Sequence, residues 1–172
     1  NIIVGGNGGF SIYKDGFFKT FNANDGIPFG YVNNIMVEGS NIWLGTMDGL
    51  VLYNGKKFRV YTEEDGLSNP WINRIQKGPN GKIWIATNGG LSIFDGSKFS
   101  KLSYKDCLPN NQINDIYFDK SGNAIISSNG GVVKYNGKTF IRLDPKSADY
   151  NFELNRGLQI NRTKDGIYWF TD

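Results

Sequence analysis

Short runs of alternating hydrophobic and polar residues, separated by glycine-rich turns, repeat along the whole chain. One unit contains four such runs, "INRIQKG" (72–78), "KIWIAT" (82–87), "LSIFDG" (91–96) and "KFSKLS" (98–103). Alternation predicts strands with one face toward a core, whereas the continuous apolar stretch in "KIWIAT" predicts a strand buried on both faces. Gly-Gly, Asp-Gly or Asn-Gly pairs between the later runs provide the positive φ angles of tight hairpins. Each unit is therefore predicted to be a four-stranded antiparallel sheet.

The units recur with a period of about 41 residues. The spacing is 41 from Trp43 to Trp84 and 41 from Gly90 to Gly131. A period in this range made only of strands is typical of β-propeller blades, because solenoid repeats of similar length are helical. A small residue occupies the matching position of each unit, where adjacent sheets would come close: Gly5, Gly45, Ala86 and Ser127. One blade cannot bury both faces alone, so the blades must pack against one another.

We expect an all-β fold of β-propeller blades with four antiparallel strands. The 172 residues are interpreted as one propeller fragment with repeats at about 1–40, 41–81, 82–122 and 123–166, and 167–172 would begin a further repeat. Five second-strand runs but only four first-strand runs are present, so a closed four-bladed ring would leave one apolar run without a place. We therefore predict an open arc. Its end faces would be covered by missing blades of a longer parent propeller or by a second copy of the chain.

Composition excludes several functional classes. The net charge is +3 and the basic residues are spread singly, so no nucleic-acid partner is expected. No apolar run approaches the roughly 18 residues of a membrane helix, so the segment itself is expected to be soluble. Cys107 is the only cysteine, which excludes an intramolecular disulfide. The chain has no histidine, the commonest general base and metal ligand, so we expect no catalytic residue, cofactor or metal.

The stretches "KIWIATNGGLSIFDGSKF" (82–99) and "DGLSNPWINRI" (65–75) resemble the two-component regulator propeller repeat. The resemblance covers essentially the whole chain, although the "DGL" element becomes "DCL" at 106–108. This family occurs in periplasmic sensor regions of hybrid two-component histidine kinases, mostly from Bacteroidetes. The resemblance implies a segment of a larger propeller of the seven-bladed type. It also implies a periplasmic location and a membrane-anchored parent whose kinase domain lies outside this chain. The chain begins inside a repeat and lacks an initiating Met, which indicates a piece of something longer.

The loop before each first strand is the candidate ligand site. It varies between units while its flanks repeat, and it carries aromatic and amide side chains. The candidates are Phe29, Tyr31, Asn69, Trp71, Asn110, Asn111 and Gln112. In propellers this connection lies on the face that usually binds ligands. Aromatic rings beside amides suit an oligosaccharide, which offers apolar ring faces and hydroxyls. The alternative is that these side chains only pack the loops or neighbouring blades.

Three functions are compatible with the sequence. The first is a non-catalytic periplasmic sensor segment that recognises a glycan. The second is a propeller enzyme of the virginiamycin-lyase-like type, because "GIYWFTD" (166–172) resembles the "WFT" element of those lyases. Those enzymes resemble histidine-dependent catalysts, and this chain has no histidine. The third is a protein–protein interaction scaffold of the tryptophan-aspartate repeat type, whose Gly-His and Trp-Asp pairs are absent here.

Recurring acidic residues are interpreted as structural. Asp25, Asp65 and Asp106 each occur once per unit at the same phase, which indicates turn residues and not a carboxylate cluster. The stretch "DKSGN" (119–123) lacks the full spacing of a calcium loop and its closing Glu, so we expect a polar turn there.

Overall fold

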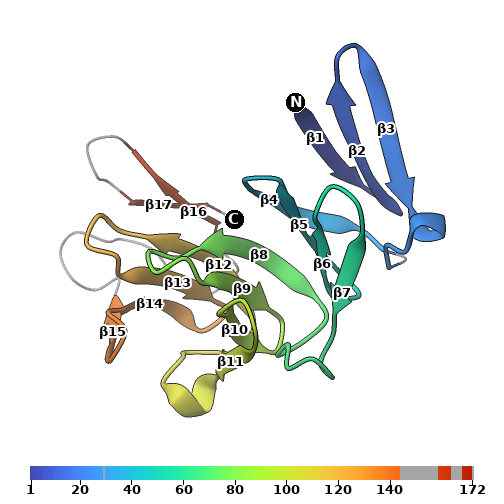
Figure 1. Cartoon of the computed structure of the whole chain (residues 1–172). Coiled ribbons are helices and arrows are strands. Elements are labelled where there is room, and N and C mark those ends of the chain that lie inside the picture. The colour runs from blue at the N-terminus through green and yellow to red at the C-terminus, as the bar shows by residue number, and fades with distance from the viewer. Residues whose placement is uncertain (29, 144–158, 164–167, 172) are drawn as a thin grey trace.

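The computed structural model describes residues 1–28, 30–143, 159–163 and 168–171. It forms five antiparallel sheets that follow one another along the chain and that we call blades 1 to 5 (Figure 1). Blade 1 contains β1 (Ile2–Gly6), β2 (Gly9–Lys14) and β3 (Phe17–Asn22). Blade 2 contains β4 (Val32–Glu38), β5 (Asn41–Thr46), β6 (Leu50–Tyr53) and β7 (Phe58–Tyr61). Blade 3 contains β8 (Ile72–Lys77), β9 (Ile83–Thr87), β10 (Gly90–Phe94) and β11 (Phe99–Leu102).

Blade 4 contains β12 (Ile113–Phe118), β13 (Ala124–Ser128), β14 (Gly131–Tyr135) and β15 (Phe140–Leu143). Blade 5 contains β16 (Gln159–Arg162) and β17 (Tyr168–Thr171). The helices of the described ranges are two single 3-10 turns, η1 (Ala23–Asp25) and η2 (Tyr104–Asp106). The predicted all-β fold of four-stranded blades is confirmed. The predicted repeats begin at the second strand, whereas a complete blade begins at its first, so the division into repeats remains a prediction.

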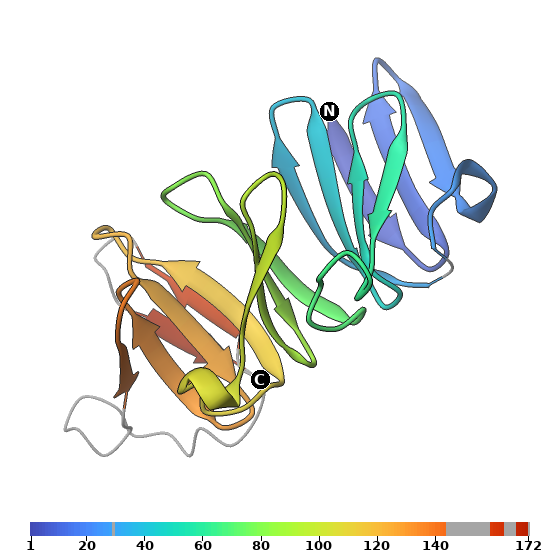
Figure 2. The ribbon, with the colours of Figure 1, turned by 60° about the horizontal axis from the view of Figure 1, so that its bottom comes forward.

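The blades are arranged around their first strands. Strand β8 contacts both β4 and β12, and β12 contacts β16. The first strands therefore lie innermost, and the fourth strands β7, β11 and β15 form the outer edges. Figure 2 shows blades 1 to 4 side by side in an arc.

The strand buried on both faces lies between two interblade cores. In β9, Ile83 and Ile85 belong to the core with blade 2, whereas Trp84 and Ala86 pack toward blade 4. The column of small residues faces the first strand of the next blade. A Cβ atom on Gly45 would lie 2.6 Å from Cγ2 of Ile72, which is too close for any side chain to be added without movement.

The face of blade 1 that points away from blade 2 has no partner among the described residues. Ile2, Val4 and Phe18 on this face are 60%, 51% and 66% exposed. The matching residues of blade 2 include Ile42 and Leu44, which are buried against blade 1. Blade 1 thus exposes a face of the kind that packs against a neighbouring blade, so the predicted open arc is confirmed.

Candidate ligand site on the loop face

The loops that precede the first strands lie on one face of the arc, together with the turns between second and third strands. The amide of Asn88 donates to the carbonyl of Trp71 over 3.2 Å, and the amide of Asn129 donates to that of Gln112 over 3.1 Å. We call this side the loop face. These hydrogen bonds hold each loop to the hairpin of its own blade.

Three predicted residues occupy the same position in successive blades. Tyr31, Trp71 and Gln112 each come directly before an innermost strand, and these strands are neighbours. They therefore follow one another along the inner edge of the loop face, which we call the rim. The Tyr31 and Trp71 side chains are 54% and 42% exposed, and Gln112 is also exposed. The rim thus presents two aromatic residues and one amide to solvent.

An asparagine lies at a β-bulge of β4, β8 and β12, the strands that follow the rim residues. Pairing with the second strand shifts by one residue at Asn33, Asn73 and Asn114. The Asn73 amide group donates to the carbonyl of Ile113 over 2.7 Å, and that of Asn33 donates to Ile72 over 3.1 Å. A bulge turns its residue out of the regular ladder, so these side chains can bond the next blade. This asparagine recurs in the sequence as "VNNI" (32–35), "INRI" (72–75) and "INDI" (113–116), but only the structure shows that it joins blades.

The same asparagines also connect to the hairpin turns. Asn73 donates to Oδ1 of Asn88 over 2.8 Å, and Asn114 donates to Oδ1 of Asn129 over 3.0 Å. The Asn129 amide group donates in turn to Oε1 of Gln112 over 2.6 Å. A chain of amide side chains therefore connects the bulge at Asn114 to Gln112 of the rim. Apart from Gln112, these residues are not among the candidates that the sequence predicts.

The residue after each bulge provides a second link between blades. Oδ1 of Asn34 accepts from the amide of Ile75 over 2.9 Å, and Oδ2 of Asp115 accepts from that of Ile160 over 2.7 Å. Arg74 occupies this position in blade 3 and has no acceptor to offer. Its Nε instead lies 3.2 Å from Oδ1 of Asp115, as an ion pair. The pKa of the Asp115 carboxyl lies above its ordinary value. Burial raises this pKa, and its effect exceeds the lowering by the hydrogen bond from Ile160 and by the charge of Arg74.

The remaining amide candidates hold the loops themselves. Oδ1 of Asn69 accepts from the amide of Trp71, and Oδ1 of Asn110 accepts from the amide of Gln112, over 3.0 and 2.8 Å. Oδ1 of Asn111 accepts from the amide of Tyr104 over 2.8 Å. These are turn contacts within one loop, so they favour the packing alternative for the three asparagines. Phe29 lies outside the described residues. Ligand binding by any of the seven candidates remains a prediction.

The recurring aspartates are turn residues, as predicted. The side chains of Asp25, Asp65 and Asp106 each accept a hydrogen bond of 2.9 Å from the backbone amide three residues earlier. The next residue is left-handed, with φ of 96° at Gly26 and 77° at Cys107. Cys107 thus stands where glycine is otherwise preferred.

Residues 119–123 form the predicted polar turn. Oδ1 of Asp119 accepts from the amides of Ser121 and Asn123, both over 2.9 Å, and Oδ2 is paired with Lys134 over 2.8 Å. Burial alone would raise the pKa of Asp119, but the hydrogen bonds from Lys134 and Asn123 outweigh it and hold this pKa at about 2. Within the described ranges, no group of three or more His, Cys, Asp and Glu residues is placed to hold a metal ion.

Comparison with protein families supports the predicted resemblance. The model of the two component regulator propeller matches residues 66–89, which run from the β7–β8 loop through β9. The resemblance to this repeat is therefore confirmed for one unit of the chain. A search of curated proteins finds no match.

Solved propeller structures share the fold. One is the extracellular domain assigned to the hybrid two component system BT3049 of B. thetaiotaomicron, with 21% identity and a TM-score of 0.76 over 96% of this chain and 24% of that domain. The corresponding domain of BT4673 has 16% identity and a TM-score of 0.65 over 94% of this chain and 25% of its own. A catalytically inactive His-to-Ala variant of virginiamycin B lyase from Staphylococcus aureus has 16% identity and a TM-score of 0.70. The match covers 94% of this chain and 55% of the lyase.

These similarities establish a propeller fold, and the chain spans only about a quarter of the two extracellular domains. None of the helices in the described part of the chain has the length and apolar character needed to cross a bilayer.

Proposed function

We propose that this chain is a non-catalytic ligand-recognition segment of a periplasmic sensor propeller, and that its rim binds a glycan. The match of residues 66–89 to the two component regulator propeller supports the sensor assignment. The likeness to extracellular domains assigned to hybrid two component systems supports a location outside the cytoplasm. The membrane anchor and the histidine kinase domain would lie elsewhere in the parent protein.

One observation carries the glycan assignment: Tyr31 and Trp71 are exposed at equivalent positions on neighbouring innermost strands. Buried aromatic residues need no ligand to explain them, but exposed aromatic residues at a repeated position offer stacking surfaces to the apolar faces of successive sugar rings. Gln112 continues this row with a polar group that can bond a hydroxyl. Asx turns at Asn69 and Asn110 fix the loops, which lowers the entropy cost of binding.

The bulge asparagines provide a route from the rim to the rest of the propeller. Asn73 is two residues from Trp71 and bonds the innermost strand of the next blade. A sugar that shifts the rim would change the packing between blades, and this change would be passed to the kinase as a shift in population.

The test is isothermal titration calorimetry with a panel of neutral oligosaccharides. Trp71→Ala should weaken binding by about tenfold, the loss of one stacking contact. The matched control is Tyr104→Ala, which removes a 58% exposed aromatic side chain that lies on η2, outside the rim. If no oligosaccharide binds, or if Trp71→Ala binds as the wild type does, the glycan assignment is wrong.

The lyase alternative is not favoured. A His-to-Ala variant of the lyase from S. aureus is described as catalytically inactive, and this chain contains no histidine. The remaining alternative, a protein–protein interaction, would use the end of the arc and not the rim. We propose that the exposed face of blade 1 is covered by further blades of the parent or by a second copy of the chain.

A further inference from the structure

The gap between blades 1 and 2 holds two adjacent cavities that lie outside the rim. Their volumes are about 980 and 590 Å³, and both are lined by Lys19, Phe21, Tyr53 and Gly55. We call the combined space the lysine cleft. Its larger part is also lined by Ile3 and Ile12.

The cleft lies where blade 1 carries a smaller side chain than blades 2 and 3 do at the same position of the repeat. Ile3, Trp43 and Trp84 each stand two residues before the small residue of the interblade column. Trp43 fills the gap between blades 2 and 3, where it is 3% exposed and its ring lies 6.1 Å from that of Tyr61. Trp84 packs in the gap between blades 3 and 4, where the cavity beside it is only about 360 Å³. Isoleucine has no ring to fill the corresponding gap between blades 1 and 2, so this gap stays open.

The cleft is cationic. Four lysines line it, and one acidic residue, Asp25, does so. Oδ2 of Asp25 accepts the amide of Asn22, so this carboxylate serves the turn. Lys14 is paired with Asp15 at 3.9 Å, but within the described ranges neither Lys19 nor Lys56 forms an ion pair.

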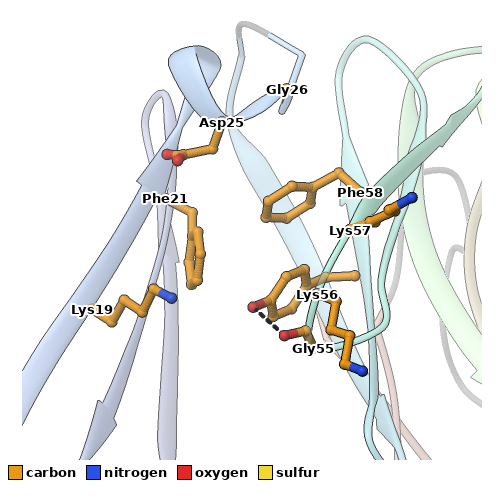
Figure 3. Close-up of a pocket in the computed structure, with 9 residues that line it drawn as sticks. Lys19, Phe21, Asp25, Gly26, Gly55, Lys56, Lys57 and Phe58 are labelled. Atoms are coloured by element: carbon orange, nitrogen blue, oxygen red, sulfur yellow. Dashed lines mark hydrogen bonds between the residues drawn. The ribbon is translucent and has the colours of Figure 1, made fainter.

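The lysines stand beside flat apolar surfaces. In Figure 3, Lys19 and Lys56 lie on opposite sides of the gap, and the rings of Phe21 and Phe58 lie between them. The ammonium group of Lys19 is 4.9 Å from the centre of the Phe21 ring. The hydroxyl of Tyr53 donates to the carbonyl of Gly55 over 2.9 Å, so Tyr53 offers the cleft its ring and not a free donor. The cleft therefore combines aromatic walls with positive charge and few neutral hydrogen-bond donors.

We propose that the lysine cleft binds a small aromatic carboxylate. The ring system enters between Ile3, Ile12 and Tyr53, and the carboxylate pairs with Lys19, the one cation common to both cavities. A cavity of this size and lining is typical of small-molecule sites. This site is separate from the rim and does not depend on the proposed glycan binding.

The probe is 2-naphthoate, titrated by calorimetry, with neutral 2-naphthamide as the matched ligand. The carboxylate should bind at least about tenfold more tightly than the amide, because it gains a charge-assisted bond. Lys19→Met keeps the length of the side chain but removes the charge, and it should weaken 2-naphthoate binding by about tenfold or more. The control is Lys98→Met, which changes the one lysine in the turn between β10 and β11 of blade 3.

Ile3→Trp is a second variant. It introduces tryptophan, the residue found at the matching positions of blades 2 and 3. It should fold, as checked by circular dichroism, and should abolish 2-naphthoate binding by filling the cleft. Trp71→Ala should bind 2-naphthoate as the wild type does, which separates this site from the rim. The proposal is overturned if 2-naphthoate fails to bind at millimolar concentration, if the amide binds equally well, or if Lys19→Met or folded Ile3→Trp retains wild-type binding.

Discussion

Trp43→Ala tests whether the interblade core holds the arc together. Trp43 is 3% exposed and its ring lies 6.1 Å from Tyr61 and 5.9 Å from Phe94, the latter in the next blade. Truncating a buried aromatic side chain costs ~3–5 kcal/mol, from lost burial and the cavity left behind. The Trp43 indole also donates to Glu38 over 3.3 Å, but Glu38 keeps its pair with Lys77 at 2.6 Å. Loss of this hydrogen bond therefore adds no more than ~1 kcal/mol.

The measurement is urea denaturation followed by far-UV circular dichroism. A loss of ~3–5 kcal/mol is a large share of the ~5–15 kcal/mol that stabilises a typical domain, so the midpoint should fall markedly. Trp84→Ala should cost less, because Trp84 is only partly buried. Trp71→Ala is the matched control, since this tryptophan is 42% exposed at the rim and should cost under ~1 kcal/mol. Equal midpoints for Trp43→Ala and Trp71→Ala would refute the assignment of Trp43 to the space between blades.

Three further outcomes follow from the structure. Gly45→Val should cost ~1–3 kcal/mol in chemical denaturation, because the new side chain meets Ile72, whereas Gly6→Ala, with open space around it, should be nearly neutral. Asp119 has a pKa of about 2 against an ordinary 3.8, so its ~1–2 kcal/mol of stability is present above about pH 4 and is lost as the pH falls through 2. Asp119→Asn should remove that part of the acid dependence of the unfolding midpoint, and an unchanged pH profile would contradict the assignment. Light scattering should show concentration-dependent association through the open face of blade 1, and Phe18→Glu should abolish it; a monomeric wild type at every concentration would contradict this.

Much of the fold follows from local patterns. Alternation and turn residues predict strands and hairpins because they depend on neighbours a few residues apart. The 41-residue period from Trp43 to Trp84 then gives the order of the blades. The aspartate of each turn is predicted in the same way, because its side chain bonds a backbone amide only three residues away. The count of first and second strands also indicates an arc.

Only part of the candidate site can be predicted from the sequence. Variable loops point to the correct segments, but exposure separates Tyr31 and Trp71 from the asparagines that hold the turns. The role of Asn73 is a contact with Ile113, 40 residues away and in the next blade. Such a contact depends on how two sheets pack, which no local pattern records.

The chemistry of neighbouring residues therefore predicts the strands and turns, and their recurrence along the chain predicts the blades and the open ends. Tertiary structure decided which side chains form the rim and how asparagines at the bulges join the blades. It also decided that Ile3, an ordinary strand residue in the sequence, opens a cleft. Its size matters only where a neighbouring sheet leaves room for the tryptophan that blades 2 and 3 carry at that position.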